Sequence, residues 1–166
     1  QMNMQVSKEF GMYFARIPLK SSAKIIHENA LRLNWNTVIE PEKLTYIMGN
    51  PPYSGAMVMG SSQREDMANI FPALKGAKIL DYVSCWFVKA AEFIINTDIT
   101  VGYVSTNSIC QGEQVGLLWG HLKNKFNISI NFAHRTFQWL NEAKGKAAVH
   151  CIITGFSTKD SPVKRL

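Results

Sequence analysis

The sequence lacks a cysteine framework, a long apolar run and a clustered block of charge. Its three cysteines, Cys85, Cys110 and Cys151, are widely spaced in apolar surroundings. This pattern predicts buried thiols in a reducing cytoplasm and excludes a disulfide scaffold or a zinc motif. No run is apolar and long enough to span a bilayer and no signal-peptide pattern is present, so we expect no membrane partner. None of the four histidines has metal-ligand spacing, so we expect no metal in the site.

What is present fits one globular domain. The chain has 166 residues, of which 46% are hydrophobic and 18% charged, enough to bury a core. We therefore expect a single domain over residues 1–166, with residues 1–22 forming an irregular arm. The net charge of +6 favours a polyanionic partner such as nucleic acid.

Strand-like and helix-like segments alternate along the chain. We expect strands at 23–29, 43–50, 98–107, 127–137 and 147–156, and helices at 66–71, from Asp81 onward, and at 114–125; residues 54–65 are expected to be a polar loop. This order predicts an α/β fold: a mostly parallel sheet with helices on its faces and an antiparallel hairpin formed by the last two strands. Asn29, Asn50 and Asn107 all end expected strands, where open α/β sheets bind ligands.

The tetrapeptide Asn50-Pro51-Pro52-Tyr53 follows one of these strands. The exocyclic amine of a purine is a poor nucleophile because its lone pair is delocalised into the ring. The Asn50 side-chain oxygen and the Pro51 carbonyl can accept both of its N–H groups and free that lone pair. Two prolines fix the backbone and so preorganise these acceptors. Tyr53 offers a face on which a base turned out of its duplex can stack.

The motif and four further blocks resemble one enzyme family. "NPPY" after an apolar strand resembles the catalytic motif of S-adenosylmethionine-dependent amino-methyltransferases, in the form typical of adenine-N6 DNA methylation. "HENALRLNW", "DYVSCWFVKAAEFI", "VGYVSTNSICQGEQVGLLW" and "INFAHRTFQWLNEAKGKAAVHCIITGF" are similar to consecutive blocks of the MmeI-like single-chain restriction-and-modification enzymes. The resemblance covers the chain from about Phe10 onward. It implies a partial Rossmann-like class I methyltransferase sheet acting on double-stranded DNA with a flipped adenine.

The resemblance also implies roles for individual residues. Asn50, Pro51, Pro52 and Tyr53 match the catalytic loop, and a second aromatic against the flipped base is either Phe137 or Trp139, with Phe137 preferred. The cofactor S-adenosylmethionine is expected to contact Asn29, Ala30, Asn50 and Tyr82, although Tyr82 and its neighbour Trp86 fit an ordinary helix core equally well. Asn107 either lines the site or caps the next segment. Lys144, Lys146 and Arg135 are the expected DNA contacts.

The chain departs from this family in one respect. The family holds the cofactor over a glycine-rich F-x-G-x-G loop, and no G-x-G occurs here. We therefore expect the first strands of the family fold to be missing. The chain is then a fragment that is inactive alone, binds the cofactor weakly and leaves the 43–50 strand as an exposed edge open to self-association. Its function would belong to a longer bacterial, cytoplasmic polypeptide, with magnesium needed only if that polypeptide carries a nuclease.

Two other interpretations of the sequence remain open. Asn-Pro-Pro-Tyr also resembles the motif of methyltransferases that act on guanine amines in RNA or on amide side chains in proteins. Alternatively, the chain is a non-catalytic, methyltransferase-like module for DNA binding or subunit contact, which would account for the absent glycine-rich loop.

Overall fold

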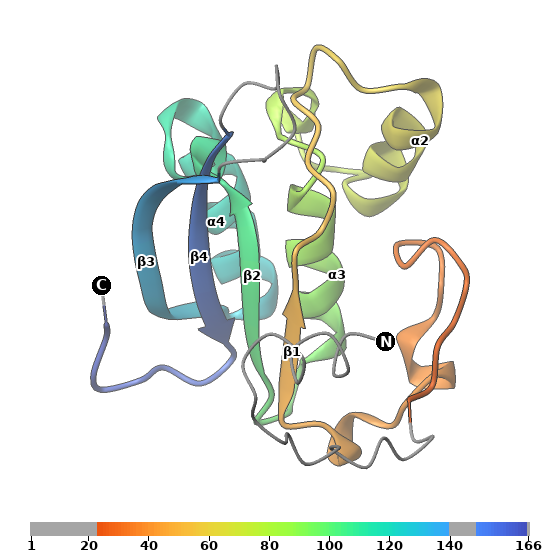
Figure 1. Cartoon of the computed structure of the whole chain (residues 1–166), viewed down its shortest axis with the longest axis vertical. Helices are drawn as coiled ribbons and strands as arrows, with labels where there is room; N and C mark the ends of the chain where they lie inside the picture. Colours follow the sequence, from red (N-terminus) through yellow and green to blue (C-terminus); the bar gives the residue numbers. More distant parts are fainter. Residues whose placement is uncertain (1–22, 140–148, 166) are drawn as a thin grey trace, which may run out of the picture.

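The computed structural model describes residues 23–139 and 149–165, and these form one four-stranded sheet with helices (Figure 1). The expected arm at 1–22 lies outside the described residues. The strands are β1 (Tyr46–Gly49), β2 (Thr100–Thr106), β3 (Ser129–Trp139) and β4 (Val149–Ser157); the α-helices are α2 (Ser61–Ile70), α3 (Ser84–Phe93) and α4 (Gly112–Phe126); and the short 3₁₀ helices are η1 (Trp35–Thr37), η2 (Pro41–Lys43), η3 (Ala77–Ile79) and η4 (Asn107–Cys110).

The strand order in the sheet is β1-β2-β4-β3. β1 pairs with β2 in parallel, whereas β4 is antiparallel to both β2 and β3. The C-terminal hairpin is thus confirmed, and so is the α/β class. Within the described part of the chain, β1 is an edge strand with one neighbour, as expected for a strand whose partner is absent.

The core lies between one face of the sheet and helices α3 and α4, which Figure 1 shows behind the strands. β2 alternates strictly, with Val101, Tyr103 and Ser105 buried, because successive side chains of a strand point to opposite faces. The rings of Phe87 on α3 and Phe156 on β4 stack at 5.4 Å in this layer. Within residues 23–139 and 149–165, no helix has the length and apolar content needed to cross a membrane.

The other face of the sheet is open in the described residues. Met48 of β1 is 84% exposed, and Tyr46 is also exposed. With Phe132 of β3 they line a hollow of about 490 Å³. Helices were expected on both faces, and the described helices cover only one of them.

The expected strand at 23–29 is wrong. These residues form no strand, and Ile25 is 86% exposed. A strand is stabilised by a ladder to a neighbour, and the described sheet offers this segment none. The parallel part of the sheet is therefore reduced to the pair β1 and β2, and Asn29 does not end a strand.

Two further expectations need correction. The expected loop at 54–65 ends earlier, because α2 begins at Ser61 and Gln63 Oε1 accepts the Gly60 N–H at 3.0 Å, which satisfies an otherwise unpaired donor at the helix start. Cys85 and Cys151 are buried, but Cys110 is exposed at the end of η4.

The Phe132 ring generates a stability prediction. A Cβ on Gly155 would lie 1.9 Å from this ring, whereas a Cβ on the cross-strand partner Gly102 would lie 3.8 Å from it. We expect Gly155→Ala to displace the ring and destabilise the fold by roughly 1–3 kcal/mol. Gly102→Ala is the matched control and should cost less. Chemical denaturation measures both, and equal midpoints for the two variants would contradict the prediction.

Candidate active site

The Asn50–Tyr53 loop leaves the carboxyl end of β1, at the edge of the sheet where β2 also ends. Asn50 and Pro52 are exposed, Pro51 is buried and Tyr53 is half-buried against the core. The Tyr53 hydroxyl lies 3.9 Å from the Cys151 Sγ. Burial and Cys151 raise the pKa of Tyr53, and the neighbouring Asn50 side chain opposes that shift, so the phenol stays neutral near pH 7. The loop therefore presents a polar amide and a neutral aromatic ring together.

A second aromatic residue reaches the same edge from β3. Phe137 pairs with Cys151, the residue beside the Tyr53 hydroxyl. The register slips just before it, because His134 pairs with Ile153 and three β3 residues therefore span two of β4. Such a bulge bends a strand and re-aims its side chains. Trp139 ends β3 opposite Val149, and its side chain lies outside the described part.

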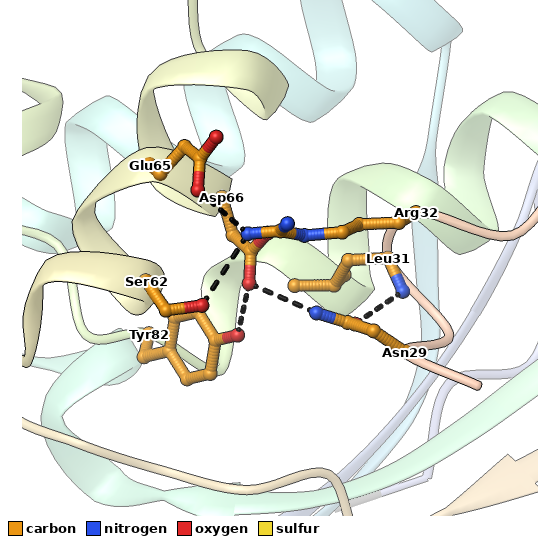
Figure 2. A network of polar contacts seen from close by, with 7 residues as sticks. All are labelled: Asn29, Leu31, Arg32, Ser62, Glu65, Asp66 and Tyr82. Atoms are coloured by element: carbon orange, nitrogen blue, oxygen red, sulfur yellow. Dashed lines mark hydrogen bonds and ion pairs between the residues drawn. The ribbon is translucent and has the colours of Figure 1, made fainter. Parts of the chain in front are cut away.

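A cluster of polar side chains surrounds the buried carboxylate of Asp66 on α2 (Figure 2). It accepts hydrogen bonds from the Tyr82 hydroxyl at 2.7 Å, Arg32 Nε at 2.7 Å and Asn29 Nδ2 at 3.1 Å. Arg32 also bonds Glu65 at 2.9 Å. Burial alone would raise the pKa of Asp66, but these donors outweigh it and hold the pKa below its usual range. The cluster fastens residues 29–32 to α2.

This cluster contains two of the expected cofactor contacts, Asn29 and Tyr82, and a third, Ala30, directly follows Asn29. Asn29 is exposed, and its Oδ1 accepts the Leu31 N–H at 3.0 Å. A carbonyl oxygen has two lone pairs, so this fixed amide can still accept one further hydrogen bond. Ala30 is half-buried, and its carbonyl accepts from Trp35 Nε1 at 2.9 Å. The Asn29 Oδ1 is thus suited to accept a hydrogen bond from the amine of a bound adenine ring, because the orientation of the side chain is already set.

Tyr82 lies in the core rather than open to a cavity. It is 5% exposed, precedes α3 instead of lying on it, and meets Trp86 edge-on at 5.0 Å. Burial and Asp66 raise its pKa. Of the two readings of this residue, the structure favours a core side chain that positions Asp66.

The remaining expected residues are dispersed. Asn107 begins η4 directly after β2, half-buried. Arg135 is exposed at the β3 bulge. Lys144 and Lys146 lie outside the described residues.

Two buried carboxylates, Asp66 and Asp81, were missed as site residues. Asp66 opens a short apolar stretch in the sequence, and Asp81 precedes another. A carboxylate buried in a core must be paired. An aspartate beside an apolar stretch therefore indicates a buried hydrogen-bonded group, but the sequence does not show which residues are its partners.

The Asp66 cluster generates a prediction of stability and pH dependence. We expect Asp66→Asn to cost about 1.5–3 kcal/mol of unfolding free energy at pH 7, because bonds to a charged acceptor are lost. The folded-state pKa is lowered, so this contribution is present above the ordinary value of 3.8 and disappears as pH falls through the folded-state pKa. Denaturation at several pH values measures it.

Glu65→Gln provides the matched control, since the Arg32–Glu65 pair is largely exposed and should contribute less than about 1 kcal/mol. Equal losses in the two variants, or a loss in Asp66→Asn that persists below both pKa values, would contradict the assignment.

Comparisons with known proteins show the family to which the chain is similar. The family model described as the MmeI DNA-methyltransferase domain matches residues 1–166. DNA methyltransferase A of Bacillus subtilis (strain 168) is 40% identical over 168 residues, which cover 99% of this chain and 19% of that protein. A structure of the Type IIL restriction–modification enzyme MmeI in complex with DNA is 54% identical, with a TM-score of 0.81, over 97% of this chain and 22% of that one.

The chain thus spans about a fifth of the length of each of these relatives. The match runs through the Asn50–Tyr53 loop, the Asp66 cluster and the C-terminal hairpin alike. This chain belongs to the family of MmeI DNA-methyltransferase domains.

Proposed function

We propose that the chain is the catalytic part of a site-specific adenine-N6 DNA methyltransferase within a restriction–modification enzyme. The observation that carries the proposal is the convergence of three distant segments at one edge of the sheet. Asn50 follows β1, the Tyr53 hydroxyl lies 3.9 Å from Cys151 of β4, and Phe137 of β3 pairs with Cys151. An amide acceptor and two aromatic residues are the groups needed to hold and stack a flipped base.

The reaction is direct methyl transfer. S-adenosylmethionine, when bound, supplies an electrophilic methyl carbon on a sulfonium sulfur. The Asn50 oxygen and the Pro51 carbonyl accept the two N–H groups of adenine N6, and Pro51 and Pro52 hold both acceptors in place. Bound S-adenosylmethionine would supply the methyl group with its sulfur as the leaving group, and Asn50 and Pro51 would hold the amine for that transfer. The nitrogen then releases one proton to an acceptor or to water.

Asn29 supports cofactor binding at the adenine end. Its side chain is oriented by Asp66 and Leu31, which lowers the entropic cost of accepting a ligand amine. Asn50 lies next to both the cofactor and the base, and Ala30 continues the turn that contains Asn29. Tyr82 acts indirectly, because its hydroxyl donates to the Asp66 carboxylate that orients Asn29.

DNA approaches from the edge that carries Asn50 and Phe137. Arg135 lies exposed at the β3 bulge beside Phe137, where a guanidinium can contact phosphate. Lys144 and Lys146 belong to the connection between β3 and β4 and carry the same proposed role.

The open sheet face and the edge of β1 fit a chain that functions inside a longer polypeptide. Among the described residues, Met48 is exposed and β1 has a neighbour on one side only, and such features favour association. We propose that the remainder of a bacterial, cytoplasmic enzyme covers them, and that copies of the isolated chain associate through them. Magnesium is needed only by a nuclease elsewhere in that enzyme.

The experiment that tests the function changes Asn50 to Ala in the full-length enzyme. We expect N6-methyladenine to fall below detection when product nucleosides are analysed by mass spectrometry, because one of the two amine acceptors is lost. Cofactor affinity should change little.

Asn69→Ala, at an exposed position of α2, is the matched control and should methylate normally. Continued methylation by Asn50→Ala would contradict the proposal, as would a methylated product found in RNA or protein instead of DNA.

A second experiment concerns the isolated chain. Because the chain contains no G-x-G loop, we expect calorimetric titration with S-adenosylmethionine to show far weaker binding than the full-length enzyme shows. Binding of equal strength would show that the residues of this chain suffice for the cofactor site.

A further inference from the structure

Asp81 is a buried carboxylate at which three segments meet. It is 5% exposed and lies between the end of the Asn50–Tyr53 loop, the carboxyl end of β2 and the start of α3. Its Oδ1 accepts the Ser54 N–H at 3.1 Å and the Val83 N–H at 3.4 Å. Its Oδ2 lies 2.9 Å from the Thr106 hydroxyl and 3.2 Å from the Ser108 hydroxyl.

The two hydroxyls complete the site on the β2 side. They lie 2.7 Å from each other, and each carries a single proton. One therefore donates to Oδ2, while the other donates either to the same oxygen or to its neighbouring hydroxyl. The backbone of Asp81 is also held by α4, because its N–H donates to Gln114 Oε1 at 3.0 Å. The carboxylate is thus an anchor with a set position.

Ser54 is held on both sides of its backbone. Its N–H donates to Asp81, and its carbonyl accepts the Tyr82 N–H at 3.0 Å. Ser54 directly follows Tyr53, and Asn50 directly follows β1. The four residues of the loop are therefore attached at one end to the sheet and at the other end to Asp81.

Prolines alone do not set this arrangement. Pro51 and Pro52 restrict the dihedrals of the loop, but the direction of the loop relative to the sheet depends on what holds its far end. Rigid placement of the reacting groups matters, because a displacement of about 1 Å can cost about a hundredfold in rate.

We propose that Asp81 is a positioning residue for methyl transfer, which anchors Ser54 and thereby sets the Pro51 carbonyl and the Tyr53 ring against the flipped base. The inference rests on the function proposed for Asn50–Tyr53. Asp81 itself touches neither base nor cofactor; it acts through the loop.

The pattern of donors predicts how substitutions differ. Asp81→Asn keeps an oxygen for the Ser54 and Val83 N–H groups, and its new N–H₂ faces hydroxyls that can rotate and accept. Asp81→Ala removes the acceptor and leaves the two backbone N–H groups unpaired. A side chain needed only for its charge would lose function in both variants. A side chain needed only for its volume would leave the Ser54 N–H without its dependence on the Asp81 oxygen, which amide exchange measures.

The experiment uses the full-length enzyme with a DNA duplex that contains its recognition site. Single-turnover methylation by Asp81→Ala should fall by about a hundredfold, with little change in the dissociation constants for DNA and S-adenosylmethionine. Asp81→Asn should recover most of the rate.

Hydrogen exchange at the Ser54 amide, which does not depend on activity, should speed up in Asp81→Ala and stay slow in Asp81→Asn. Asp98→Ala, at an exposed aspartate paired with Lys159, is the control and should match the wild type.

Unchanged exchange at Ser54 in Asp81→Ala would overturn the inference, whatever the activity. A wild-type rate in Asp81→Ala would overturn it as well, as would a loss of rate that Asp81→Asn fails to recover. Failure of the proposed function has a different signature, since methylation then survives Asn50→Ala while Ser54 exchange still reports on the anchor.

Discussion

The parallel pairing of β1 with β2 is the constraint on which the site depends. It places the ends of the two strands at the same edge, so that Asn50 follows β1 where Thr106 ends β2. The fit is close, because a Cβ on Gly49 would lie 3.2 Å from the ring of its buried partner Tyr103. β1 has only four residues and one described neighbour, so this single ladder and the contacts of its loop fix the position of Asn50.

Two buried carboxylates then attach the irregular segments to this frame. Asp66 fastens the Asn29–Arg32 turn to α2, and Asp81 fastens Ser54 to β2 and α3. Each carboxylate accepts several hydrogen bonds from segments far apart in the sequence. Loops cannot be held by a sheet ladder, and a buried acceptor with several donors gives comparable rigidity. The chain therefore holds the Asn29–Arg32 turn and the Asn50–Tyr53 loop by the same physical means.

Periodicity and turn residues predicted most of the fold. The alternation in 98–107 and the apolar spacing after Asp81 gave β2 and α3 correctly within a few residues, and the C-terminal hairpin was recognised from two strand-like runs. The strand predicted at 23–29 was wrong because an apolar run forms a strand only where a neighbour can pair with it, and the described sheet offers none. Isoleucine is common in strands, yet the side chain of Ile25 is exposed.

Only part of the site was predicted from the sequence. The Asn50–Tyr53 motif is contiguous, so the sequence displays it directly. The roles of Asp66 and Asp81 depend chiefly on partners 16 to 37 positions away, which no local pattern reveals. The β3 bulge that precedes Phe137 is likewise a property of pairing with β4. The resemblance pointed to Phe137, and the register shows that Phe137 pairs with Cys151, whose Sγ lies 3.9 Å from the Tyr53 hydroxyl.

The most direct measurement is a crystal structure of the full-length enzyme with its DNA site and an unreactive analogue of S-adenosylmethionine. We predict a flipped adenine whose N6 lies within about 3.2 Å of both the Asn50 Oδ1 and the Pro51 carbonyl, with the Tyr53 ring on one face of the base. An adenine that remains stacked in the duplex, or whose N6 is bound by other acceptors, would contradict it.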